Sequence, residues 1–346
     1  MGKNRRMMLL FEWIFFCMNQ WGFILCLTML GIILFSLRGD ACQANRQPRM
    51  SNKGSISHIY IAGGLEDHVV RLDGFSAKNW ISYGMYSRDR SRNDDAEGRF
   101  DKVTSVAVDD QERIYITDEG HKRLCRVDDM NGRNWIDFRL LGSPLSVYVT
   151  RTGRIYVLLR NGLVSGQDHL IRMEDMTGRG LVDLPFSHGP GKMQLHWPYA
   201  VFVDAQERIY LTDSGNARII RMDDMQGNGW ITLGTRGKGK SQFGRPSGIF
   251  VTEQGQIYIA DQDVRWIVRF DDMSGKGWTV FYGARYKHFL GAYSIWIGKD
   301  NRIYYLEIID NSDCKIVRMD NMKGDNLSII AAPTQGIHGQ SAIVVR

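Results

Sequence analysis

A short acidic segment recurs six times along this chain and constrains its fold more than any other feature. In residues 268–278 it reads "VRFDDMSGKGW", with an arginine, two acidic residues, a glycine and a final tryptophan. Successive copies lie 46 to 55 residues apart, as their arginines show: Arg71, Arg126, Arg172, Arg221, Arg269 and Arg318. Repetition at a nearly constant period of this length is typical of repeat architectures. The segment is therefore predicted to be part of the architecture.

Each period also contains the same order of strand-like runs. An apolar run such as "AVFV" (200–203) is followed by a polar turn and by a run such as "RIYLTD" (208–213). A third run leads into the acidic segment, and a fourth begins at the tryptophan or leucine that ends it. These runs are rich in β-branched and aromatic residues and are separated by turn residues, which favours strands over helices. Four strands in a unit of this length predict one blade of a β-propeller.

The two ends of the repeat region predict how a ring of blades would close. The first copy starts at "HIYIAGG" (58–64), which matches the second strand of the other copies. The residues "GQSAIVVR" (339–346) align with "RPSGIFVT" (245–252), which contains an inner strand. Pairing the two ends would remove two exposed sheet edges. We therefore predict an all-β fold over 57–346, a six-bladed β-propeller of four-stranded blades closed by a C-terminal strand.

Two stretches of the chain resemble the NHL repeat, a propeller-forming family. "FGRPSGIFVTEQGQIYIAD" (243–261) and "WPYAVFVDAQERIYLTDSGNARIIRMD" (197–223) show an inner strand and an "IY" strand that ends in aspartate, and the second adds an Asn-x-Arg-Ile segment. The resemblance covers residues 57–346 and implies an NHL-type six-bladed propeller. Copies 1, 3 and 6 depart from the pattern because their second strand lacks the final aspartate.

The repeated carboxylates admit two interpretations. Asp223 and Asp224 resemble a cation site, but the first copy has Gly74 in place of the second acid, and no distal glutamate completes a calcium loop. A turn in which Asp or Asn bonds the backbone and glycine takes a positive φ is therefore favoured over calcium. The aspartates that end the second strands, namely Asp118, Asp213 and Asp261, are expected to pair with the backbone or with Arg123, Arg218 and Arg265.

The N-terminal residues differ in kind from the repeats. An apolar region ends in "WGFILCLTMLGIILFSL" (21–37), which has 17 residues without a charge. This run exceeds a typical signal-peptide core and approaches the roughly 20 residues that span a bilayer. We therefore expect a hydrophobic helix within 1–37, acting as a signal-anchor or signal segment, and a polar linker over 38–56.

The small residues after this helix leave its processing open. Cleavage after Ala41 or Ala44 would release a secreted domain, whereas an uncleaved segment would anchor the chain in a membrane through residues 9–37. The length of the apolar run favours the anchor. Under either interpretation the propeller is expected outside the cytoplasm, as a monomer.

The five cysteines do not indicate a disulfide framework. Cys17 and Cys26 lie in the apolar segment and Cys42 lies in the linker, so only Cys125 and Cys314 fall within the repeats. Those two belong to different copies, each on the strand before the acidic segment. They are expected to be buried structural thiols.

The loops that lead from each outer strand to the next inner strand vary most between copies, and such loops commonly carry function. Together with a net charge of +6, they predict a basic and aromatic rim at one mouth of the channel: Arg236, Lys238, Lys240, Arg245, Arg285, Tyr286 and Lys287. Such a rim favours an anionic partner. Some NHL propellers bind RNA on a face of this kind, but the export segment argues against nucleic acid. A protein loop, an anionic glycan or an envelope polymer would use the same charges.

Three residues in these loops share one slot relative to the inner strands and suggest a metal site. Asp101, His196 and His338 each lie five residues before an aligned inner-strand residue, and the two histidines belong to blades three steps apart. Two imidazoles and a carboxylate suit Zn or another divalent ion. Some related propellers, such as the peptide-amidating lyase, hold a metal on this axis. Ordinary loop side chains with no cofactor are the simpler interpretation.

Other propeller activities lack their residues in this sequence. Lactonase-like propellers hold calcium through Glu, Asp and Asn where the inner strands start, and here those positions are Ser105, Ser146, Ala200, Gly248, Ser294 and Ala342. Serine and cysteine nucleophile signatures are also missing. The sequence therefore favours a non-enzymatic recognition propeller that binds a protein or an anionic polymer at the loop-rich mouth. The alternative is a metal-assisted lyase or hydrolase that uses Asp101, His196 and His338 at the central channel.

Overall fold

In the computed structural model the chain divides into two compact units, Met1–Asn52 and Lys53–Arg346, and the described residues all belong to the second. The structure describes residues 58–63, 67–76, 78, 80–86, 96–160, 167–283, 291–308, 313–335 and 342–346. The predicted hydrophobic helix and the linker lie outside these residues. Within the part of the chain that is described, no helix is both long and apolar enough to cross a membrane.

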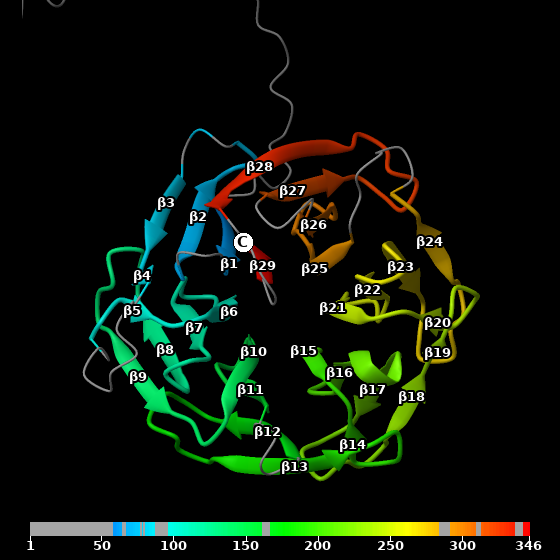
Figure 1. Ribbon diagram of the computed structural model, residues 1–346, viewed down its shortest axis with the longest axis horizontal. Helices are drawn as coiled ribbons and strands as arrows, with labels where there is room; N and C mark the ends of the chain where they lie inside the picture. Colours follow the sequence, from blue (N-terminus) through cyan, green and yellow to red (C-terminus); the bar gives the residue numbers. More distant parts are fainter. Residues whose placement is uncertain are drawn as a thin grey trace, which may run out of the picture. The chain divides into compact units, whose positions relative to one another are not determined.

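The described residues between 58 and 346 form six blades arranged in a ring, as Figure 1 shows, and each blade contains four antiparallel strands. The inner strands are β29 (Ala342–Val345), β6 (Val103–Val108), β10 (Ser143–Val149), β15 (Pro198–Val203), β21 (Pro246–Val251) and β25 (Ala292–Ile297). The second strands are β1 (His58–Ala62), β7 (Ile114–Asp118), β11 (Ile155–Arg160), β16 (Ile209–Asp213), β22 (Ile257–Asp261) and β26 (Ile303–Ile308).

The outer half of each blade completes the predicted four-strand unit. The third strands are β2 (Val69–Asp73), β8 (Arg123–Val127), β12 (Gln167–Met173), β17 (Arg218–Met222), β23 (Trp266–Phe270) and β27 (Asp313–Met319). The outer strands are β3 (Trp80–Tyr83), β9 (Ile136–Arg139), β13 (Val182–His188), β18 (Ile231–Leu233), β24 (Thr279–Phe281) and β28 (Ser328–Gln335). Short parallel pairs join β4 (Met85–Tyr86) to β5 (Arg99–Phe100), β13 to β14 (Gln194–Leu195) and β19 (Thr235–Arg236) to β20 (Gln242–Phe243).

The ring closes as the sequence predicts. Strand β29 pairs antiparallel with β1, with Ile61 opposite Ile343 and Ile59 opposite Val345. His58 and Arg346 then exchange two main-chain hydrogen bonds, of 3.2 and 2.9 Å. The prediction of six blades and of a first blade divided between the two ends of the propeller is therefore confirmed.

The hydrophobic core lies between neighbouring blades, because alternate residues of a strand face opposite sides of its sheet. One core cluster joins Leu158 and Leu170 of the third blade to Val201, Leu211 and Ile220 of the fourth. The inner strands are also linked by serine hydroxyls that accept main-chain N–H groups of the next blade: Ser105 from Val147 at 3.3 Å, Ser146 from Val201 at 3.3 Å and Ser294 from Ile343 at 3.1 Å. The thiols of Cys125 and Cys314 are buried and free, as expected.

The acidic segments form the turns between the third and outer strands. In the fourth blade, Asp224 Oδ1 accepts the N–H groups of Gln226 at 2.9 Å and Asn228 at 3.1 Å, and Gly227 has a φ of +74°. Met225 is buried beneath the turn. These contacts are those of the structural interpretation, in which the second acid caps the turn and glycine supplies the left-handed backbone.

Candidate functional site

The channel has two ends that differ in construction. We call the end where the inner strands begin the loop-rich mouth, because the long connections from the outer strands arrive there. We call the end where the inner strands finish the turn mouth, because short turns lead there to the second strands. The residues predicted to be functional that the structure describes, namely Asp101, His196, Arg236, Lys238, Lys240 and Arg245, belong to the loop-rich mouth.

Buried aspartates hold the backbone of the loop-rich mouth in place. Asp213 has no exposed surface; its Oδ1 accepts the N–H of His196 at 2.8 Å, and its Oδ2 accepts Arg218 Nε at 2.7 Å and Asn216 Nδ2 at 2.8 Å. Burial raises the pKa of Asp213, while these donors act in the opposite direction. Asp118 binds Arg123 in the same way, as predicted. Asp261 instead accepts main-chain N–H groups, those of Gly244, Arg245 and Val264.

The predicted metal ligands are only partly within the described residues. Asp101 and His196 occupy equivalent places in the second and fourth blades, where the main-chain carbonyl of each accepts the N–H of Gly120 or Gly215 at 2.7 Å. His338 lies outside the described residues. Within the described ranges, no three His, Cys, Asp or Glu side chains are grouped so that they could hold a metal ion. The site made of Asp101, His196 and His338 therefore stays a prediction.

His196 has two aromatic neighbours that the sequence did not single out. Its ring lies 4.4 Å from that of His188 and 5.0 Å from that of Trp197, measured between centroids. Trp197 is 62% exposed and its backbone has a φ of +52°, a conformation that is costly for a bulky residue. Lys102, the equivalent residue of the second blade, also has a positive φ, of +66°, so the left-handed backbone belongs to the repeat and the exposed indole is what distinguishes this position. One indication of this site was present in the sequence, because Trp197 occupies a position where the other copies carry small or charged residues.

The structure divides the predicted basic rim into different roles. Arg236 donates to the carbonyl oxygens of Gly244 at 3.1 Å and Gly215 at 3.0 Å, so it ties two loops together. Arg245 Nε lies 3.5 Å from Asp263 Oδ1, with almost half of its side chain exposed. Lys238 and Lys240 are exposed on the loop between β19 and β20. Arg285, Tyr286 and Lys287 lie outside the described residues, so the rim as a whole stays a prediction.

The turn mouth is built from compact turns whose hydrogen bonds are local. Asp204 Oδ1 accepts the N–H groups of Gln206 at 3.0 Å and Arg208 at 2.9 Å. Its Oδ2 accepts Arg208 Nε at 2.7 Å and the Tyr210 hydroxyl at 3.0 Å. Asp109 of the second blade forms the same set of bonds. Each turn is therefore fixed by its own residues.

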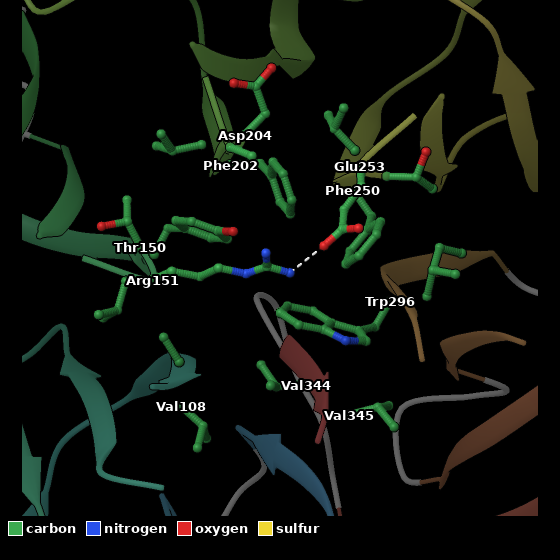
Figure 2. Close-up of a pocket in the computed structure, with 18 of the residues that line it drawn as sticks. Val108, Thr150, Arg151, Phe202, Asp204, Phe250, Glu253, Trp296, Val344 and Val345 are labelled. Atoms are coloured by element: carbon green, nitrogen blue, oxygen red, sulfur yellow. Dashed lines mark hydrogen bonds and ion pairs between the residues drawn. The ribbon is translucent and has the colours of Figure 1, made fainter. Parts of the chain in front are cut away.

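A recess of about 600 Å³ opens at the turn mouth (Figure 2). Four aromatic side chains from consecutive inner strands line it, and we call them the aromatic arc: Tyr148, Phe202, Phe250 and Trp296. Ring centroids along the arc are separated by 4.6, 5.1 and 5.1 Å, with interplanar angles between 51° and 66°. The other two blades place Ala107 and Val344 in the corresponding positions. Small side chains on one side and tilted rings on the other leave the open space.

Charged residues from the turns surround this recess. Arg151 of the third blade forms an ion pair with Glu253 of the fifth, and Figure 2 shows the arginine extending across the recess to reach it. Their side chains are 73% and 63% exposed. Arg346 binds Asp110 at 3.0 Å and also donates to the Val108 carbonyl. Sequence reasoning placed function in the variable loops and missed this recess, although "SVYV", "AVFV", "GIFV" and "SIWI" carried its signal.

Comparisons with known proteins show the fold. No protein-family model matches the chain, and a search of curated proteins finds no significant match. A solved structure of a protein of unknown function from Bacteroides caccae has 10% identity and a TM-score of 0.61, covering 84% of this chain and 99% of that chain. A streptogramin B lyase structure has 14% identity and a TM-score of 0.53, covering 82% and 86%. The protein is a six-bladed β-propeller, and its NHL character stays a prediction.

Proposed function

We propose that this propeller is a non-enzymatic recognition domain that binds an anionic partner, either an acidic protein segment or an anionic polymer, at the loop-rich mouth. The predicted hydrophobic segment at the N-terminus supports a location outside the cytoplasm, tethered to a membrane. The single observation that carries the proposal is the presentation of Trp197, an exposed aromatic side chain on a fixed backbone.

The backbone before Trp197 is held from both sides. The N–H of His196 is bound by the buried carboxylate of Asp213 at 2.8 Å, and its carbonyl accepts the N–H of Gly215 at 2.7 Å. The main chain that carries the indole ring is therefore fixed without a partner, so binding requires little ordering of the backbone at this position. Tryptophan is among the residues that most often dominate the free energy of an interface.

Positive charge lies next to this aromatic site. Arg236 donates to the Gly215 carbonyl, and Gly215 in turn packs on His196, so the loop that carries Lys238 and Lys240 is joined to the backbone of Trp197. Exposed cations of this kind chiefly steer an anionic partner and depend strongly on salt. The predicted cations Arg285 and Lys287 would extend the same charge.

The proposal can be tested with the full chain in detergent and with two anionic probes, heparin and poly-glutamate. We expect both the affinity and the association rate to fall as salt is raised, and Trp197→Ala to weaken binding about 10-fold or more. Trp80→Ala is the matched control, because Trp80 is also exposed but lies on the outer strand of the first blade. Unchanged binding by Trp197→Ala, or no retention of either probe at low salt, would contradict the proposal.

A further inference from the structure

The recess at the turn mouth has the size and lining of a site for a small organic ligand. Its volume of about 600 Å³ falls within the roughly 300–1,000 Å³ of known ligand sites. The rings of the aromatic arc are inclined to one another by 51° to 66°, so they form a concave wall instead of a flat stack. The wall is therefore largely aromatic, and the π face of each aromatic ring carries negative charge density.

The carboxylates around the recess are engaged to different degrees. Asp204 accepts four donors within its own turn, and Glu207 accepts Arg154 and the Tyr156 hydroxyl, each at 3.1 Å. Asp110 is bound by Arg346. Glu253 differs, because within the described residues its ion-pair partner is Arg151, a long and exposed side chain from two blades away. Exposed ion pairs contribute little free energy, so this pair opens readily.

The arginine in this pair marks the position of a cation. Figure 2 looks into the recess and shows the Arg151 side chain reaching the Glu253 carboxylate, with Phe202, Phe250 and Trp296 among the residues that line the same recess. A positive group placed there has a negative carboxylate beside it, and the aromatic arc lines the same recess. Aromatic faces, and tryptophan most of all, attract organic cations, and several rings together recognise quaternary ammonium groups.

We propose that the recess at the turn mouth binds a small quaternary or alkylated ammonium compound, whose cation replaces the Arg151 guanidinium beside Glu253. The apolar substituents of the ammonium group lie against the aromatic arc, and the remainder of the ligand points out of the mouth. Arg151 acts as an internal competitor that covers the recess when the ligand is absent. This site lies at the opposite end of the channel from Trp197 and does not depend on the function proposed for the loop-rich mouth.

The two partners of one ion pair should then have opposite effects on binding. Choline is the probe, and its neutral carbon isostere 3,3-dimethylbutan-1-ol is the matched control ligand, with both titrated into the full chain by calorimetry. We expect choline to bind and the isostere to bind at least about 10-fold more weakly, because only choline carries the charge. Removing the competitor with Arg151→Ala should tighten choline binding several-fold, and Glu253→Gln should weaken it about 10-fold or more.

Further variants separate the ligand site from general structural damage. Trp296→Leu should weaken choline binding, whereas Gln254→Ala, a neutral change on the same rim, should leave it within about 2-fold. Trp197→Ala should not affect choline binding at all. Equal binding of the isostere, no choline binding up to millimolar concentration, or weaker binding in Arg151→Ala would overturn the proposal. Because Arg151 is an exposed surface residue, its substitution tests the idea without risk to folding.

Discussion

The loop-rich mouth and the turn mouth of the same channel are held together by interactions of different range. At the turn mouth, Asp204 binds only residues up to Tyr210, so the conformation of that turn is set within the turn, and Glu207 adds bonds to Arg154 and Tyr156 of the neighbouring blade. At the loop-rich mouth, Asp213 reaches back to His196 and ties a long loop to a strand hairpin. A turn that is fixed by its own residues can recur in several blades. A loop that is held by a buried aspartate such as Asp213 can differ in length and sequence between blades, provided that the aspartate is present.

The blades differ from one another in different places at the two mouths: in the loops at the loop-rich mouth and in the side chains of the channel wall at the turn mouth. The loops of the loop-rich mouth differ visibly between copies, yet the 600 Å³ recess lies at the other end, among short turns. Its individuality comes from one position on each inner strand, occupied by rings in four blades and by Ala107 and Val344 in the other two. A repeat protein can therefore acquire a specific site through single side chains that face its axis.

The largest change in the free energy of unfolding should follow the loss of Asp213, whose carboxylate binds a loop distant in sequence. Asp213→Ala leaves Arg218 buried without its charged partner, and we expect unfolding free energy to fall by about 3–5 kcal/mol. Urea unfolding measures the loss, and hydrogen exchange should show faster exchange over residues 189–197. Asp204→Ala is the matched variant at the turn mouth. We expect it to cost about 1–3 kcal/mol and to raise exchange only within its own turn, and spreading of that effect across the blade would break the comparison.

A second test at the loop-rich end uses pH. Glu307 occupies in the sixth blade the place of Asp213, and burial raises its pKa from 4.5 to about 7, with Lys315 opposing. A carboxyl with a raised folded pKa favours folding while it is protonated, so its contribution is complete below about pH 4.5 and is lost as pH rises through about 7. Glu307→Gln should therefore stabilise the protein by up to about 3 kcal/mol at about pH 8 and have much less effect at about pH 4.5. Equal effects at both pH values, measured by chemical unfolding, would contradict this assignment.

A smaller loss of stability is expected when a hydrogen bond between the inner strands of neighbouring blades is removed. Ser146→Ala removes the hydroxyl that accepts the Val201 N–H at 3.3 Å, and we expect a loss of about 1 kcal/mol. Ser294→Ala removes the same type of bond between the sixth and first blades and should give a similar loss. Thermal unfolding of both variants measures the contribution. A much larger loss in only one of them would show that the blades are not equivalent.

The smallest effect should come from the ion pair across the turn mouth. Because Arg151 and Glu253 are mostly exposed, a double-mutant cycle with Arg151→Ala and Glu253→Ala should give a coupling below about 1 kcal/mol, decreasing with salt. The result sharpens the contrast with Asp213, whose partners are buried. A coupling of several kcal/mol would mean that the pair is a structural clamp and not a movable cover.

The fold was predictable because its signals are repeated and local. Six acidic turns, six "IY" strands and an inner strand at 342–345 fixed the blade count and the closure, since each copy supports the others. The position of Asp213 at a strand end likewise indicated its pairing with Arg218. For Asp261 the pattern left open whether the backbone or Arg265 would be the partner, and three main-chain N–H groups bind its carboxylate.

The candidate sites were harder to predict because they arise from side chains that are distant in sequence. Nothing in the sequence around His196 indicates that its ring meets His188, or that the Trp197 backbone is left-handed. Arg151 and Glu253 are 102 residues apart and meet only because two blades face the same opening. Sequence variation drew attention to the loops, while the recess depends on how six axial positions combine.

The pairing of β29 with β1 has a consequence for the order of assembly. On the ribosome, β1 emerges early and must wait for residues 342–345 before its inner edge acquires a partner. The nascent domain is therefore an open chain of blades, with an adhesive strand edge exposed to other chains until translation has nearly passed the last blade. Premature termination before residue 342 would leave that edge permanently available for aggregation.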